Sequence, residues 1–185
     1  MRALSGLTGG MTSPAPGTFK SFLSSIQSPA LRAVAHHWHE ARGRKRVASW
    51  DEIPSSALST HAKLLWAYAY DRKLGAFTGR FTGKRWGKWV GMDFHGKRLE
   101  DIHSPANYRN TLKLLTEVVT TPLASRSSGC LFKVDSFVVT GERIILPLGE
   151  DGQTADGVLG ASDYAPPPLK GTLELILENP EWYAI

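Results

Sequence analysis

The chain has 185 residues, of which 42% are hydrophobic and 21% are charged. These values suit one folded domain with extensions and exclude a chain that is disordered throughout. The single cysteine, Cys130, cannot form an internal disulfide, so we expect a reducing, cytoplasmic setting. The sequence shows neither a signal peptide nor the run of about 18 apolar residues that a membrane-spanning helix needs.

Charge is distributed unevenly along the chain, although the net charge is only +5. Residues 1–113 hold 18 Lys and Arg against 7 Asp and Glu, whereas residues 114–185 hold 4 against 10. Such asymmetry can steer an acidic partner or a nucleic acid toward the basic half of a molecule. A surface with scattered, solvated charges explains the same counts without any partner.

Residues 1–27 are rich in Gly, Ser, Thr and Pro, which predicts a flexible arm that ends in a short helix near Phe22. Ser28 and Pro29 then form a helix start. A serine side chain accepts a free backbone N–H there, and proline loses no hydrogen bond at the first helical position. Apolar residues at helical spacing follow, and Gly43 is placed to end this first long helix.

Large aromatic residues alternate with smaller ones between Leu64 and Tyr70, which predicts a strand. Residues 71–75 turn the chain, and residues 76–90 are expected to return as a second strand. The side chains expected on one side of that strand are Phe77, Gly79, Phe81 and Gly83.

Two helices are expected next. A short helical turn is predicted over Leu99–Ile102, and Ser104 with Pro105 opens a longer helix. That helix should end before Pro122, because proline disfavours helical geometry in the residue that precedes it. Its expected buried face consists of Tyr108, Leu112, Leu115 and Val119.

Three further strands are predicted, around residues 123–133, 136–148 and 157–164, with gaps short enough for antiparallel pairing. The tail begins with Pro166-Pro167-Pro168, a stiff extended spacer. The apolar residues of 173–177 then predict an edge strand or a segment that holds a partner.

Several short motifs occur in an order that is typical of one known family. They are Arg80-Phe81-Thr82-Gly83, Gly91-Met92-Asp93-Phe94-His95-Gly96, Leu99-Glu100-Asp101-Ile102, Ile145-Leu146-Pro147-Leu148-Gly149-Glu150-Asp151-Gly152 and Leu159-Gly160-Ala161. A helix that contains a tryptophan precedes them. In these features residues 28–164 resemble the short, stand-alone PAS-domain proteins common in alphaproteobacteria.

The resemblance implies an α+β fold: a five-stranded antiparallel sheet in the order 2-1-5-4-3 with helices on one face. Residues 1–27 would then be an arm, residues 28–164 the domain and residues 165–185 a C-terminal extension. PAS domains bind small molecules between sheet and helices, form dimers and relay their state to a protein partner. The resemblance therefore implies a sensory or interaction module rather than an enzyme, with an unknown ligand or cofactor and a homodimer through the first helix.

Six side chains are candidates for the lining of such a pocket. They are Tyr68, Tyr70, Phe81, Tyr108, Leu112 and Phe137. A register error of one residue would turn a strand position to the opposite face. The alternative is that all six fill a dry core.

Catalytic and metal-binding patterns are missing from the sequence. His36 and His39 share a helix face, but a metal site needs three or four ligands, and these two are expected to face solvent. His95 or His103 would be the candidate if a haem were bound, and Cys130 is expected to be a small apolar side chain. Nucleophile elbows, phosphate loops and dinucleotide motifs are absent from the sequence, so we assign no catalytic residue and no metal.

Two other functions remain open. The segment Arg80–Trp89 mixes cations with aromatic residues, as single-stranded nucleic-acid sites do. An arginine or lysine beside a tryptophan also simply covers the ring, so nucleic acid is not the expected partner. An enzyme that acts on a nucleotide or small acid is the second alternative.

Overall fold

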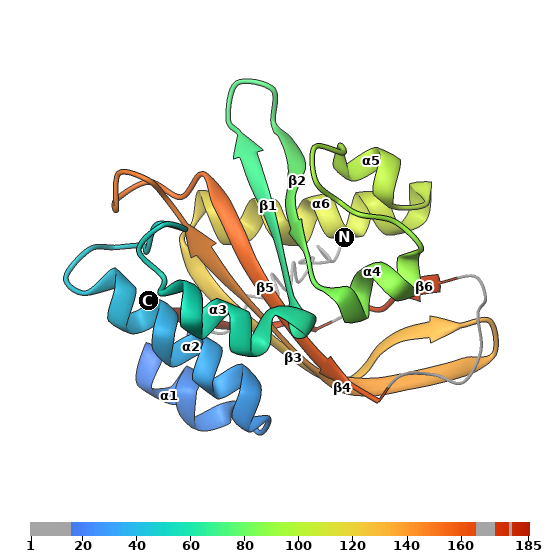
Figure 1. Cartoon of the computed structure of the whole chain (residues 1–185), viewed down its shortest axis with the longest axis horizontal. Coiled ribbons are helices and arrows are strands. Elements are labelled where there is room, and N and C mark those ends of the chain that lie inside the picture. Colours follow the sequence, from blue (N-terminus) through green and yellow to red (C-terminus); the bar gives the residue numbers. More distant parts are fainter. Residues whose placement is uncertain (1–15, 166–172, 178) are drawn as a thin grey trace, which may run out of the picture.

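An antiparallel β-sheet runs through the centre of the protein (Figure 1). The structure is a computed structural model that describes residues 16–165, 173–177 and 179–185. Within these residues seven strands pair, and five of them follow the order β2-β1-β5-β4-β3, which confirms the predicted topology. The strands are β1 (Leu65–Asp71), β2 (Ala76–Thr82), β3 (Leu123–Val134), β4 (Phe137–Leu148), β5 (Gly157–Tyr164), β6 (Leu173–Leu175) and β7 (Glu181–Ala184).

Helices cover both faces of the sheet. They are α1 (Phe19–Ser25), α2 (Pro29–Arg42), α3 (Ser55–His61), α4 (Lys84–Val90), α5 (Leu99–Ile102) and α6 (Pro105–Thr120), with a 3-10 turn at Ala62–Leu64. In Figure 1, α6 runs behind the sheet and α2 lies in front of it. The expected helices between the second and third strands pack on one face. The sequence analysis predicted helices on one face only. The layer that α1 and α2 form on the other face was not predicted.

This second layer forms because the apolar face of α2 packs against the sheet. Leu31, Val34 and Trp38 are buried there, and the indole nitrogen of Trp38 donates to the carbonyl oxygen of Pro147 at 2.9 Å. The outward side of α2 carries exposed polar residues such as Arg32 and His36. A dimer through this helix, as the sequence predicted, would therefore have to use polar contacts.

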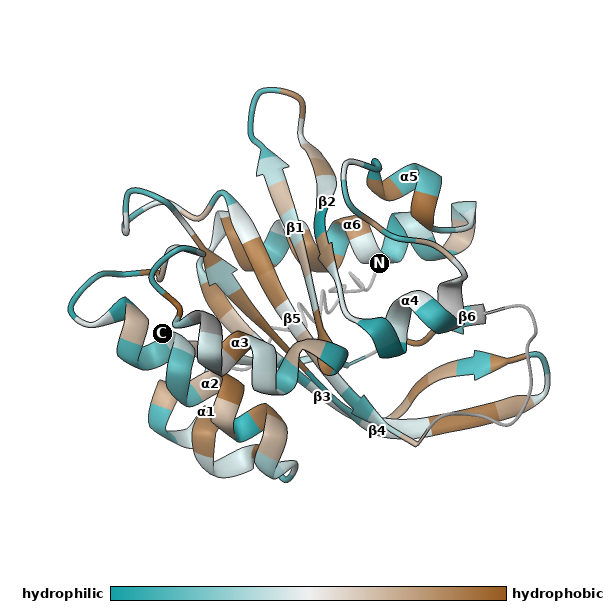
Figure 2. Cartoon of the chain, viewed as in Figure 1, coloured by the Kyte–Doolittle hydropathy of each residue, from teal (hydrophilic) through white to brown (hydrophobic). Residues whose placement is uncertain are grey.

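Strand β4 is buried on both sides because its apolar residues alternate between the two helix layers. Ile145 belongs to the core beneath α6, whereas Ile144 and Leu146 belong to the core beneath α2. Val158 and Leu159 of β5 divide in the same way. A strand buried on both faces has a nearly continuous apolar run rather than an alternating pattern. Figure 2 shows these hydrophobic residues gathered in the strands and hydrophilic residues at the outer turns.

The predicted helix starts and stops are confirmed where side-chain chemistry determines them. The hydroxyl oxygen of Ser28 accepts from the backbone N–H of Leu31 at 3.3 Å, and Gly43 ends α2 with a φ of 55°. The hydroxyl oxygen of Ser104 caps α6 in the same manner. That helix ends at Thr120, before the proline that was expected to stop it.

The second strand is shorter than predicted. It ends at Thr82, and the residues that were expected to continue it form helix α4 instead. Gly83 closes the strand by donating to the carbonyl oxygen of Leu65 at 2.7 Å, and Gly91 ends the helix in the left-handed conformation at φ 73°. The sequence analysis expected Gly83 inside the strand, whereas Gly83 precedes the first turn of α4.

A bulge also changes which way β2 faces. Ala67 of β1 pairs with Phe81, and the next residue, Tyr68, pairs with Gly79. Arg80 is therefore an extra residue on β2, and it turns Phe81 to the face opposite to Phe77. The prediction that Phe77, Gly79 and Phe81 share one side is wrong for this reason.

The two ends of the described chain meet beside β3. Strands β6 and β7 both pair with β3, so the described part of the tail adds edge strands. Gly17 exchanges backbone hydrogen bonds with Trp182 and Ala184, and Phe22 of α1 packs on Tyr183. The expected arm thus contains a buried helix between residues 16 and 27. Residues 1–15 and Pro166-Pro167-Pro168 lie outside the described residues.

We expect Gly160→Ala to destabilise the protein by about 1–3 kcal/mol, the usual cost of overpacking. A Cβ at Gly160 would lie 2.1 Å from Cζ2 of the buried Trp66 ring, which cannot move away. Gly87→Ala is the matched control, because its Cβ would meet neighbours at 3.4 Å and alanine stabilises a helix by up to about 1 kcal/mol. Urea denaturation of both variants measures the difference, and equal stability would contradict the packing described here.

Candidate functional site

A buried cavity of about 30 Å³ lies between the sheet and α6. Helix α6 contributes Thr111, Leu114 and Leu115 to its wall, and the described tail contributes Leu175 and Leu177. The sheet and the other helices contribute Trp66, Tyr68, Trp86, His103, Arg143, Ile145 and Ser162. The sequence predicted a hollow between sheet and helices, and this cavity lies there. It is small, because a single water molecule alone occupies about 10–15 Å³ on this measure.

Two polar pairs lie in the cavity wall. The hydroxyl of Tyr68 is 3.3 Å from Nε2 of His103, and the indole nitrogen of Trp66 donates to the hydroxyl oxygen of Ser162 at 3.1 Å. Burial, together with the positive charge of Arg143, lowers the pKa of His103 to about 4, so its imidazole is neutral at neutral pH. Burial also raises the pKa of Tyr68, which therefore keeps its proton.

Arg143 brings a positive charge into this wall, and it is only 3% exposed. Its guanidinium donates to the carbonyl oxygens of Leu131 at 3.3 Å and Ile176 at 3.5 Å. Among the described residues no carboxylate forms an ion pair with it. Burial lowers the pKa of Arg143 to about 10, which still leaves the group protonated at neutral pH.

Two buried hydroxyl groups near this charge have no hydrogen-bond partner. One is the hydroxyl of Thr111 in the cavity wall, and the other is that of Tyr164. The Tyr164 ring packs edge-on against Phe132 at 4.9 Å, and burial raises the pKa of its hydroxyl. A buried hydroxyl without a partner costs about 1–3 kcal/mol, so such groups are usually satisfied by water or a ligand.

The structure places the six predicted lining residues at different sites. Tyr68 lines the cavity. Tyr70 packs on Phe77 with ring centroids 4.5 Å apart, while Tyr108 and Leu112 are half-buried at the margin of the same core. Helix α6 turns Thr111, Leu114 and Leu115 toward the cavity instead.

The other two candidates lie away from the cavity. Phe81 packs against the core beneath α2, beside Trp50, because the bulge at Arg80 reverses its direction. Phe137 begins β4 and is 44% exposed. It stands next to the β3–β4 turn, where the sheet extends beyond the helices that cover it (Figure 1).

The sequence analysis did not single out Arg143, Thr111 and Ser162. One signal was available: Glu142 and Arg143 are adjacent charges inside a strand that is otherwise mostly apolar. Charges inside a strand that is covered on both faces need partners, so such a pair marks either a buried network or a binding site. His103 was named only as a candidate haem ligand, and it faces Tyr68.

Glu142 belongs to a separate polar network on the opposite face of the sheet. Its carboxylate accepts from Nε of Arg126 at 2.6 Å and from the backbone N–H groups of Gln27 and Ser28. Arg126 also donates to both carboxylate oxygens of Glu181, at 2.9 and 3.0 Å. This network joins the start of α2 to β3, β4 and β7, and its charges are satisfied internally.

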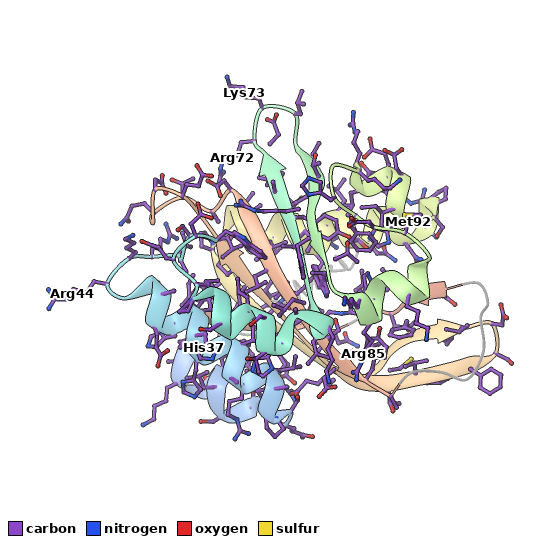
Figure 3. All side chains as sticks on the ribbon, viewed as in Figure 1. His37, Arg44, Arg72, Lys73, Arg85 and Met92 are labelled. Atoms are coloured by element: carbon purple, nitrogen blue, oxygen red, sulfur yellow. The ribbon has the colours of Figure 1, made fainter. Side chains whose placement is uncertain are left out.

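The segment proposed for nucleic-acid binding does not form a stacking surface in the described structure. Trp86 is buried in the core, and the side chain of Trp89 lies outside the described residues. Arg85 pairs with Asp163 at 3.2 Å and lies over the Tyr164 ring (Figure 3). Arg80 lies over Trp50 at 5.2 Å. An open groove of about 360 Å³ runs along α4. It is lined by Thr82, Gly83, Lys84, Gly87, Lys88, Gly91, Met92 and Asp93.

The histidines of α2 have structural contacts. His39 stacks on Phe19 with ring centroids 4.6 Å apart, and His37 lies 3.5 Å from Glu40. Across the described ranges no three His, Cys, Asp or Glu side chains are grouped so that they could hold a metal ion. Cys130 is half-buried, with Sγ 3.8 Å from the carbonyl oxygen of Phe132. None of the helices in these ranges is both long enough and apolar enough to span a membrane.

Comparison with known proteins gives one family match. The profile described as PAS domain matches residues 26–162. Curated proteins give no match. Among solved structures, the VqmA dimer of Vibrio cholerae, reported in work on LuxR-type receptors, is similar over 60% of this chain and 50% of that chain, with 12% identity and a TM-score of 0.40. Because the family profile matches most of the chain, and the strand order agrees with the order expected for that fold, the protein belongs to the PAS domain family.

Proposed function

We propose that this protein is a cytoplasmic sensory module that binds a small molecule between its sheet and α6 and passes the bound state to a protein partner. The observation that supports this most directly is the cavity itself. It contains a buried cation and an unpartnered hydroxyl, Arg143 and Thr111, in a wall that is otherwise mostly apolar. Apolar pockets with a few converging polar groups are typical ligand sites.

The small volume of the cavity indicates how binding can be transmitted. Ligand pockets commonly measure about 300–1,000 Å³, so a ligand of ordinary size must displace part of the wall. Leu175 and Leu177 belong to the tail, which is held to β3 by a short strand and by the bond from Ile176 to Leu131. We infer that ligand entry would move this tail, and a partner that binds the tail would detect the change.

Binding rather than catalysis is also supported by how the polar groups are paired. The hydroxyl of Ser162 accepts from Trp66, and His103 contacts Tyr68. Within the described cavity wall, the hydroxyl that contacts an imidazole is that of Tyr68, which keeps its proton. No serine or threonine hydroxyl of that wall is hydrogen-bonded to an imidazole, the arrangement that activates such nucleophiles in enzymes.

Native mass spectrometry of the protein purified from its own host tests ligand binding. We expect a bound small molecule in the wild type and its loss in Thr111→Leu, because the larger side chain fills the cavity. Thr120→Leu is the matched control, since it makes the same change on the exposed side of α6 and should keep the ligand. A wild type without a bound molecule, and whose Tm is unchanged by a host metabolite extract, would contradict the proposal.

The buried imidazole predicts acid sensitivity. In the folded protein His103 has a pKa of about 4, below its ordinary value of 6.5, so the unfolded chain binds a proton first as the pH falls. The stability that depends on neutral His103 is therefore complete above pH 6.5 and is lost as the pH falls toward 4, by up to about 3 kcal/mol.

Urea denaturation of the wild type and His103→Gln across this pH range measures the effect. Glutamine can still contact Tyr68 but does not titrate, so its stability should fall less steeply with acid. If the two proteins lose stability in parallel, His103 does not titrate as described.

A further inference from the structure

Two arginines of the same sheet are buried to a similar degree, but they are paired differently. Arg126 is 5% exposed and lies against the carboxylates of Glu142 and Glu181. Arg143 is 3% exposed and contacts only two carbonyl oxygens, at 3.3 and 3.5 Å. An arginine has five N–H donors, and a buried charge without a counter-charge costs several kcal/mol. Among the described residues, Arg143 therefore has no carboxylate partner of the kind that Arg126 has.

The groups around Arg143 indicate the charge of the missing anion. His103 and Tyr68 are neutral, and the charge of Arg143 acts on His103 and Tyr164, neither of which is an anion. The unpartnered hydroxyl of Thr111 can donate a hydrogen bond but adds no charge. The cavity thus holds a single positive charge, which matches a monoanion better than a phosphate or a dicarboxylate.

The shape and lining of the cavity indicate the rest of the ligand. The planar guanidinium fork matches a carboxylate, which it can bind through two parallel hydrogen bonds. Much of the remaining wall is apolar and includes Leu114, Ile145 and Leu177. The cavity of about 30 Å³ has room for roughly two water molecules before the wall moves. A carboxylate with a short hydrocarbon end fits these three properties together.

We propose that the cavity binds a short-chain monocarboxylate, with the guanidinium of Arg143 holding the carboxylate and the apolar wall enclosing the hydrocarbon end. This inference rests on the proposed function, because it names the ligand class of the same cavity. The competing explanation is that Arg143 is structural and holds the tail through the carbonyl of Ile176. The two explanations predict different effects on ligand binding and on stability when Arg143 is replaced by an uncharged residue.

Calorimetry and thermal shift with acetate, propionate and butyrate, each paired with its neutral amide and with sodium chloride at equal ionic strength, test the ligand class. We expect the carboxylates to bind and raise the Tm, and the amides and chloride to have little effect. Equal effects of carboxylate and amide would overturn the inference of an anion site, and an equal effect of chloride would overturn the assignment to carboxylates. If none of the three carboxylates binds, the inference fails.

Arg143→Met tests the role of the charge, because methionine fills a similar volume without it. We expect carboxylate binding to weaken by roughly tenfold or more, while the Tm without ligand stays the same or rises. Arg143→Lys keeps the charge but not the planar fork, and it should retain weaker binding even if the methionine variant does not fold. Undiminished binding in Arg143→Met, or a large loss of Tm with unchanged affinity, would instead support the structural explanation.

Arg72→Met is the matched control. Arg72 also donates to two carbonyl oxygens, those of Val119 and Ala155, but it lies in the β1–β2 turn away from the cavity (Figure 3). Carboxylate binding should be unchanged in this variant. Native mass spectrometry separates this inference from the proposed function. If it finds a neutral bound molecule, the cavity is still a ligand site, but the carboxylate inference is wrong.

Discussion

The pleat of strand β4 separates two opposite charges that are neighbours in the sequence. Side chains of successive strand residues point to opposite faces, so Glu142 lies on the α2 side and Arg143 on the α6 side. On an exposed strand each would be solvated, but here both faces are covered by helices. Each charge must therefore find its own partner, and the two faces of the sheet provide very different ones.

The α2 face satisfies its charge completely. Arg126, two backbone N–H groups and, through Arg126, Glu181 surround the carboxylate of Glu142, which joins segments from both ends of the chain. The α6 face leaves Arg143 with carbonyl oxygens only and retains an unpartnered hydroxyl at Thr111. The ion pairs of the sheet interior thus lie on the α2 face, whereas the cavity proposed as the ligand site lies on the α6 face.

Local chemistry explains why much of the fold could be predicted. The caps at Ser28 and Ser104 and the apolar runs of the last three long strands depend on nearby residues, and the strand order came from the family resemblance. The errors come from interactions that are distant in the sequence. The bulge at Arg80 depends on pairing with β1, and it reversed Phe81. Gly83, which precedes α4, was expected inside the second strand.

The candidate site was predicted less well for a related reason. Its location between sheet and helices followed from the family, and of the six expected lining residues Tyr68 lies in the cavity wall. Whether Arg143 faces solvent, Glu142 or a cavity depends on helices more than twenty residues away in the sequence, which no local pattern shows. The tail residues Leu175 and Leu177 become part of the wall only because β6 pairs with β3.

Both outer strands of the central sheet have part of their free hydrogen-bonding edge occupied. On β2, Gly79 donates to Lys97 and accepts from Gly96, and on β3 the strands β6 and β7 take most of the outer positions. An exposed edge invites strand addition by other chains, which leads to aggregation or to recognition of extended peptides. Because part of each edge is already paired, fewer backbone groups of β2 and β3 are free for strand addition between molecules.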